Sequence, residues 1–212
     1  MKRSYLLIAL VSGLFISRPA QAQIPVVSKV ADKITPELTI GIKLGANFQT
    51  VTSKTTLDDA YNAGIMGGLF IGLTKGKWGV QVEGIARSAK ITTKADPNTG
   101  TASATLNALN LDVPVLLEYK VIPRVWLQVG PQFTSVISSS TTGTPYKYNY
   151  FLKTSEFQAL AGLQVILPGR FTAGARYVLG ITDVNNLPTT LSAANEKWNN
   201  HSIQLYAGFR FM

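Results

Sequence analysis

Few residues of this chain have the types and spacing that catalysis requires. The 212 residues include a single histidine, His201, which Ser202 follows directly. A serine and a histidine, oriented by an acid, form the catalytic centre of many acyl hydrolases. Successive residues of a strand project to opposite faces, however, so this pair is poorly placed to act together. A histidine without a catalytic role is the favoured interpretation, and we expect no catalytic residue.

Residues that could bind a metal are equally scarce. The chain has no cysteine, which excludes thiolate sites, and one histidine cannot form the histidine cluster of a zinc site. Asp58 and Asp59 lie in a long polar loop, where a solvated surface is favoured over a calcium site. We therefore expect neither a bound metal nor a cofactor.

The remaining charged residues are placed by a repeated pattern, first seen at residues 37–48. Apolar residues alternate there with polar or small ones, as in a strand with two different faces. The stretch is longer than the usual soluble strand of about 5–6 residues. It suits a tilted strand that crosses a bilayer, which needs about 9–11 residues. The same pattern recurs seven more times, so it organises the whole chain.

The polar face of these strands carries the charged residues that could form a site. They are Lys43, Glu83, Arg87, Asp112, Glu118, Glu156, Arg176 and Arg210. Side chains fill the interior of an eight-stranded barrel, and buried charges must be paired. A plug of ion pairs is favoured over a polar channel. In this plug, Glu83 and Asp112 bond Arg87, Arg176 or Arg210. A small pore is the alternative.

The lengths of the connections favour a membrane barrel. Three short connections, near Gly76, Pro123 and Gly169, fall at one end with both termini, and four long polar loops fall at the other. Outer-membrane barrels have short periplasmic turns and longer extracellular loops. Both termini are therefore expected in the periplasm.

Aromatic residues gather at the two levels where lipid headgroups would lie. At the short-turn end these are Trp78, Tyr119, Trp126, Phe171 and Phe211, and near the long loops they are Phe48, Tyr61 and Phe157. Trp126 is the weakest member, because it shares the inward parity of Gln128. A soluble barrel would instead turn its apolar face inward. The girdles, and the charges on the small face, favour an apolar face turned outward.

We predict an all-β fold: an eight-stranded antiparallel up-and-down transmembrane β-barrel over residues 37–212. Pro114 and Pro131 fall within predicted strands. Proline donates no ladder hydrogen bond, and a closed barrel has no edge strand to accommodate it. We therefore predict β-bulges at both prolines.

The first 22 residues are typical of a cleaved signal peptide. Lys2 and Arg3 precede an apolar run at residues 6–16, and small residues surround the expected cleavage site after Ala22. The run is shorter than the roughly 20 residues of a spanning helix. Residues 23–36 are expected to form a periplasmic lead-in. The net charge of +9 comes from dispersed basic residues, so we expect no nucleic-acid partner.

Several segments together resemble the PorT-like outer-membrane β-barrel family. They are residues 41–48, 111–117, 130–131, 175–181 and 205–211. The resemblance implies an OmpA- or OmpX-like eight-stranded barrel, inserted by the outer-membrane assembly machinery, in a family whose namesake assists a protein-secretion system. Many assembly signals end on an aromatic residue, whereas here Phe211 is followed by Met212.

These observations favour a non-enzymatic outer-membrane protein with a structural or interaction role, with a link to secretion or envelope assembly. The expected partners are outer-membrane lipids, lipopolysaccharide, the assembly machinery and an unidentified protein. The long loops carry residues that could contact phosphates, glycans or protein, or act only as hydrophilic caps. These are Lys54, Lys94, Tyr146, Lys147, Tyr148 and Tyr150. A lipid-modifying enzyme resembling lipid A acyl hydrolases is a further alternative.

Overall fold

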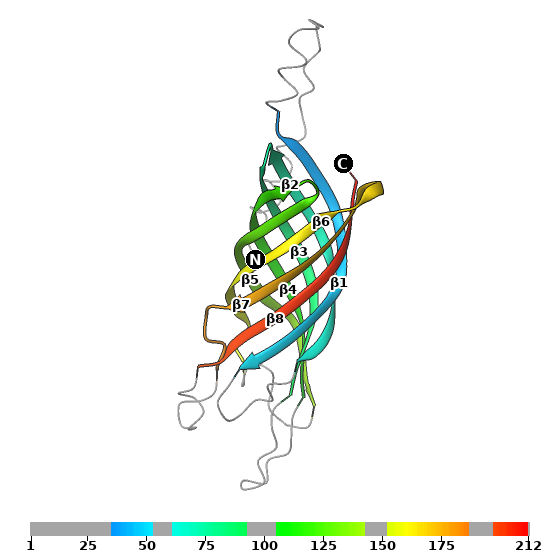
Figure 1. Ribbon diagram of the computed structural model, residues 1–212. Coiled ribbons are helices and arrows are strands. Elements are labelled where there is room, and N and C mark those ends of the chain that lie inside the picture. The colour runs from blue at the N-terminus through cyan, green and yellow to red at the C-terminus, as the bar shows by residue number, and fades with distance from the viewer. Residues whose placement is uncertain (1–34, 53–60, 93–104, 143–151, 187–196, 212) are drawn as a thin grey trace, which may run out of the picture. The chain divides into compact units, whose positions relative to one another are not determined.

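Eight antiparallel strands close into one barrel in the order β1 to β8, as the computed structural model in Figure 1 shows. The strands are β1 (Glu37–Thr52), β2 (Asn62–Lys75), β3 (Trp78–Thr92), β4 (Thr105–Ile122), β5 (Val125–Thr142), β6 (Ser155–Ile166), β7 (Phe171–Gly180) and β8 (Asn199–Arg210). The structure describes residues 35–52, 61–92, 105–142, 152–186 and 197–211. The prediction of a closed eight-stranded barrel is confirmed. The expected signal peptide and nearly all of the lead-in lie outside the described residues.

The barrel closes because β8 returns to pair with β1. Their register runs from Gly41↔Arg210 to Thr52↔Asn199, and the two strands lie side by side in Figure 1. Beyond the last pair, Phe211 N donates to Ile40 O at 2.7 Å. A closed sheet satisfies the backbone of every strand from its neighbours, which is what a bilayer requires.

The alternation of residue types decides which face each side chain occupies. On β1, Lys43 is fully buried inside, whereas its neighbour Leu44 is 67% exposed on the outside. On β2, Ile65 and Leu69 are likewise exposed, at 77% and 62%. An outer belt of large aliphatic side chains is stable only against lipid, as in transmembrane barrels. The apolar face therefore points outward, as predicted.

Inward-facing glycines make room for the long polar side chains of the lumen. A Cβ atom on Gly162 would lie 2.7 Å from Arg176 Cγ. A Cβ atom on Gly174 would meet the hydroxyl end of the Tyr206 ring, and would lie 2.8 Å from Leu163 O. The glycine content of the strands thus follows from the crowding of a narrow lumen.

The predicted bulges at Pro114 and Pro131 are wrong. Near the prolines, the pairing of β4 is interrupted once on each side. With β3, the gap lies between the pairs Val82↔Val115 and Ile85↔Asp112. With β5, it lies between Pro114↔Gln132 and Leu117↔Val129. The register is the same before and after each gap. The β4–β5 register shifts instead between Leu109 and Asn110, and between Lys120 and Ile122. Each proline removes one donor, and the neighbouring pairs hold the strands in line without an inserted residue.

Short turns join the strands at one end of the barrel. Gly76 in the β2–β3 turn has φ +64°, and Arg124 in the β4–β5 turn has φ +74°. The β6–β7 turn contains the 3-10 helix η1 (Pro168–Arg170). In the described part of the chain, no helix is long and apolar enough to cross a membrane.

At the other end, β3, β4 and β5 continue past their neighbours. Pairing of β3 with β2 stops at Met66↔Arg87, whereas β3 pairs with β4 as far as Thr92↔Thr105. Pairing of β5 with β6 stops at Ser135↔Ser155, whereas β4 and β5 pair as far as Thr105↔Thr142. Within the described residues, these three strand ends form a sheet of their own. We call it the three-stranded extension (88–92, 105–110 and 137–142).

Candidate functional site in the barrel lumen

The lumen of the short-turn half is built around Glu83. Lys43 Nζ lies 2.7 Å from Glu83 Oε1. Arg176 binds the same carboxylate with both terminal nitrogens, Nη2 to Oε1 at 2.5 Å and Nη1 to Oε2 at 2.7 Å. All three side chains are buried. A two-pronged arginine–carboxylate pair is among the strongest ionic hydrogen bonds in proteins. We call these residues and the groups bonded to them the Glu83 cluster.

Aromatic rings line the cations of the Glu83 cluster. Lys43 Nζ lies 4.9 Å from the centre of the Phe70 ring and 4.4 Å from that of Tyr206. Arg176 Cζ also lies 4.4 Å from the centre of the Tyr206 ring. Ring faces attract cations, and the attraction is stronger where water is absent. Tyr206 therefore helps to hold two cations that share one carboxylate.

A second centre, in the long-loop half, is built around Asp112. Arg87 Nε lies 2.6 Å from Asp112 Oδ2, and Arg87 Nη2 lies 3.2 Å from Oδ1. Arg87 Nη1 donates to Gln49 Oε1, and Thr134 Oγ1 donates to Asp112 Oδ1 at 2.9 Å. We call this group the Asp112 cluster. The structure thus pairs Glu83 with Arg176, and Asp112 with Arg87.

The other three charged residues of the sequence analysis lie in the lumen without an ion pair among the described residues. Glu118 accepts a hydrogen bond from Gln128 Nε2 at 2.5 Å. Glu156 accepts one from Gln158 Nε2, also at 2.5 Å. Arg210 is half-buried near the short turns, and its Nε has no hydrogen-bond partner. The eight residues carry equal numbers of positive and negative charges, so their sum is zero.

Glutamines connect the charged residues, and sequence reasoning missed this role. Gln128 Oε1 accepts from Arg176 Nε at 3.1 Å and from the Tyr206 hydroxyl at 3.0 Å. Gln132 Nε2 donates to Gln158 Oε1 at 2.7 Å. Their inward parity was visible in the alternation. Interior roles were predicted only for charged residues. A side-chain amide is uncharged, but it can donate and accept hydrogen bonds at the same time.

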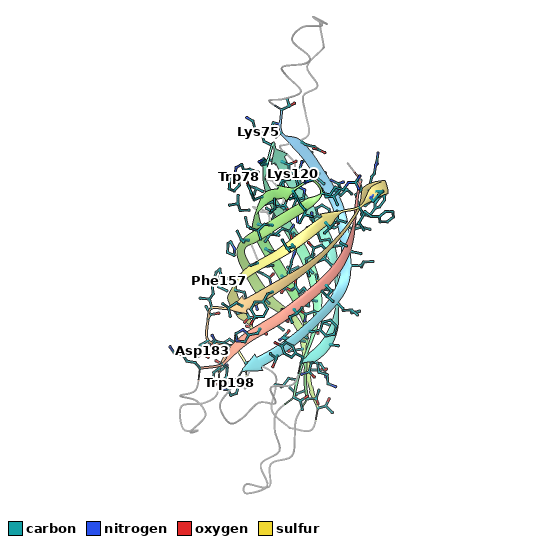
Figure 2. All side chains as sticks on the ribbon, in the orientation of Figure 1. Lys75, Trp78, Lys120, Phe157, Asp183 and Trp198 are labelled. Atoms are coloured by element: carbon teal, nitrogen blue, oxygen red, sulfur yellow. The ribbon has the colours of Figure 1, made fainter. Side chains whose placement is uncertain are left out.

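On the long-loop side of the Asp112 cluster, apolar side chains fill the lumen. Trp198 is fully buried here, and Figure 2 shows it beside Asp183, at the opposite end of the barrel from Lys75, Trp78 and Lys120. The cluster consists of Val51, Ala89, Leu106, Ala108, Leu152, Val184 and Trp198. We call it the apolar seal. Leu152, Val184 and Trp198 lie outside the strands, where no alternation of residue types predicts which side chains point inward.

Backbone hydrogen bonds hold the irregular part of the apolar seal. Lys153 N donates to Val184 O at 2.9 Å, and Val184 N donates to Trp198 O at 3.0 Å. Asp183 Oδ1 accepts from Trp198 N at 2.9 Å and from Asn185 N at 3.0 Å. The segment after β7 is thereby fixed across the mouth of the barrel.

The short-turn end of the lumen instead contains a polar cavity of about 190 Å³. Its lining includes Glu37, Thr39, Lys120, Arg124, Trp126 and Arg210. Trp126 is only 6% exposed, and Lys120 Nζ lies 5.3 Å from the centre of its ring. The assignment of Trp126 to an aromatic girdle was therefore wrong. Its parity, shared with Gln128, outweighs the tendency of tryptophan to lie at the interface.

The other girdle residues lie on the outer face, and most of them contact another aromatic ring. Trp78 and Tyr119 have ring centres 4.7 Å apart, and Figure 2 shows Trp78 near the short turns. Phe209 joins Phe171 and Phe211, with centres at 5.2 and 5.8 Å. Nearer the long loops, Phe157 lies 5.1 Å from Phe133, Tyr61 is exposed and Phe48 is half-buried.

His201 and Ser202 point to different sides of β8. Ser202 is buried in the lumen, whereas His201 Nδ1 lies 3.2 Å from the Tyr177 hydroxyl on the outside. The two side chains therefore do not form a catalytic pair. No group of three or more His, Cys, Asp or Glu residues suited to a metal is found in the described ranges. Asp58, Asp59 and the loop lysines and tyrosines of the sequence analysis lie outside them.

An apolar outer belt around a closed sheet and a polar lumen define a transmembrane β-barrel. The chain belongs to the family described as outer membrane protein beta-barrel domain, whose model matches residues 21–186. No curated protein sequence matches the chain.

Solved structures of outer-membrane barrels are similar to this chain at low sequence identity. The outer membrane protein OprG from Pseudomonas aeruginosa is 15% identical, with a TM-score of 0.52 over 84% of this chain and 96% of OprG. Neisserial surface protein A is 12% identical, with a TM-score of 0.46 over 82% and 99%. Ail of Yersinia pestis is 15% identical, with a TM-score of 0.45 over 82% and 99%. At 15% identity, the likeness to OprG extends to the fold alone.

Proposed function

We propose that this protein is a closed barrel of the Gram-negative outer membrane with a structural or interaction role. It is not a pore. The observation that supports this is the filling of the lumen between the polar cavity at the short turns and the long-loop end. The Glu83 cluster, the Asp112 cluster and the apolar seal follow one another from the short turns to the long loops. A continuous water path would have to break buried ion pairs and displace Trp198, and both steps are costly.

Conductance in planar bilayers tests the closed lumen. Folding of the purified protein is first verified by its gel mobility before and after heating. We expect no stable single-channel steps. A porin of known conductance, inserted into the same bilayers, is the positive control for channel detection. Uniform steps from the unmodified protein would contradict a closed barrel.

The three-stranded extension is the surface that we propose for contact with another protein. Among the described residues, β6 pairs no further than Ser135 of β5, and residues 138–140 beyond that point are exposed. A strand edge of this kind can pair with an extended segment of a partner through backbone hydrogen bonds. Serine side chains keep the edge soluble while it is unpaired.

Site-specific photo-crosslinking in intact outer membranes tests this surface. A photoreactive residue at Ser139 is expected to capture a protein partner. The matched control is Leu163, which is exposed on the lipid-facing belt of β6. Capture from both positions, or from neither, would contradict a specific interaction at the extension.

We further propose, from the PorT-like resemblance of residues 41–48, 111–117 and 205–211, a link to protein secretion or envelope assembly. In this proposal, residues 1–22 are removed on export and both termini of the mature chain face the periplasm, with lipopolysaccharide and the assembly machinery as further partners. N-terminal sequencing of the mature protein tests the cleavage after Ala22. Loss of secreted proteins in a deletion strain, restored by the full chain, tests the link to secretion.

A further inference from the structure

Three buried oxygen atoms at the long-loop side of the Asp112 cluster accept no hydrogen bond. They are Asn110 Oδ1, Glu156 Oε2 and Asn200 Oδ1. Their residues are 4%, 7% and 5% exposed. All three residues line one cavity, with a volume of about 20 Å³. A cavity that holds one water molecule needs at least about 10–15 Å³ on this measure, so the space suits one small ligand.

Hydrogen bonds fix the orientation of two of these groups. Glu156 Oε1 accepts from Gln158 Nε2 at 2.5 Å and from Asn200 Nδ2 at 2.7 Å. Because Asn200 Nδ2 is committed to Glu156, the other end of that amide is the oxygen. Glu156 Oε2 and Asn200 Oδ1 are thus left as acceptors on two groups that already touch each other.

Glu156 also lacks a cation in direct contact among the described residues, although the charge of Arg87 acts on it from a distance. The guanidinium of Arg87 is bonded to Asp112, and Lys153 Nζ donates to Asp183 O at 3.0 Å. A buried carboxylate without a cation in direct contact is costly, because burial removes its hydration.

We propose that Asn110, Glu156 and Asn200 bind one hard cation of the calcium class. A water molecule donates only two hydrogen bonds and would leave one of the three oxygens unsatisfied, whereas a cation attracts all three and neutralises Glu156. Calcium takes carboxylate and amide oxygens together with water. Thr154 and Ser155 also line the cavity and are exposed, so a cation can enter from outside. With one carboxylate, the affinity is expected in the range of weak extracellular sites, about 10⁻⁴–10⁻³ M.

Terbium luminescence tests this site, because Tb³⁺ replaces Ca²⁺ and emits when a nearby tryptophan is excited. Trp198 packs in the apolar seal with Val51, Leu152 and Val184, which also line the cavity. The full mature chain is refolded in detergent without lipopolysaccharide and titrated with Tb³⁺. We expect saturable emission that Ca²⁺ displaces.

Two variants decide the assignment. Glu156→Gln keeps the shape but removes the charge, and we expect Tb³⁺ affinity to fall at least about tenfold, as when a ligand sphere is disrupted. The matched control, Glu118→Gln, removes another buried carboxylate that lines a different cavity, and its affinity should be unchanged. Asn110→Asp adds a second carboxylate and should tighten binding severalfold. Absence of saturable emission, an equal loss in Glu118→Gln, or no tightening in Asn110→Asp would overturn the proposal.

Discussion

The two halves of the lumen are held together by different forces. In the short-turn half, charges dominate: Glu83 is bonded to two cations, and the mouth at the short turns is a polar cavity lined by further charged groups. In the long-loop half, Asp112 is bonded to one arginine, and the lumen ends in the fully buried Trp198. The same alternating pattern therefore supports an ionic interior and an apolar one. The difference is that residues outside the strands contribute to the apolar seal in the long-loop half.

The largest effect is expected where one carboxylate serves two cations. Glu83→Gln leaves Lys43 and Arg176 buried without their shared anion. Breaking a buried ion pair from one side costs about 3–5 kcal/mol. We expect a loss of that size in the free energy of unfolding, measured by urea titration of the barrel folded in lipid vesicles.

The control for this prediction is Lys43→Met. Glu83 keeps its two-pronged bond to Arg176, and the methionine side chain replaces the aliphatic stem of the lysine between Phe70 and Tyr206. Replacing a buried charge by an apolar group is often neutral. A loss as large as that of Glu83→Gln would show that the second cation, and not the carboxylate, organises the cluster.

The next effect tests the apolar half. Trp198→Ala removes the largest side chain of the apolar seal, and such truncations in a core cost about 3–5 kcal/mol. We expect a value near the lower limit, because water can enter from the long-loop end. The unfolding titration measures it, with Trp78→Ala on the lipid-facing side as the control of equal size. An equal loss in Trp78→Ala would mean that the seal contributes no more than the girdle.

How far the sequence predicts this interior depends on where each residue lies. Alternation within strands is enough to place Lys43, Glu83 and Arg176 on the inner face, because a strand allows only two directions. Trp198 lies just before β8, where no period applies, so its burial could not be foreseen. Trp126 was misplaced because its residue type was given more weight than its parity. The interruptions of pairing near Pro114 and Pro131 depend on the register between neighbouring strands, and the sequence of one strand does not determine that register.

A smaller effect is expected from glycine substitutions, which compare the inner face of the barrel with its outer face. Gly174→Ala places a methyl group against the Tyr206 ring, and we expect a loss of about 1–3 kcal/mol from overpacking. Gly84→Ala is the matched control, since a Cβ atom there meets nothing within 4 Å. Unfolding titrations of both variants give the comparison. Equal losses would mean that the lumen is looser than the contacts around Arg176 and Tyr206 imply.

The smallest effect belongs to the mouth of the ionic half. Lys120 Nζ lies over the Trp126 ring, but Lys120 is half-buried and close to the polar cavity. Cation–ring contacts at exposed sites contribute about 0.5–1 kcal/mol, so Lys120→Met should cost no more than that. The emission of Trp126 reports the change locally in a Trp78→Phe/Trp198→Phe background, and Lys120→Arg should preserve it. If Lys120→Met were as costly as Glu83→Gln, charge would stabilise the mouth as strongly as the buried cluster. The effect of an ion in this barrel would then not depend on its depth.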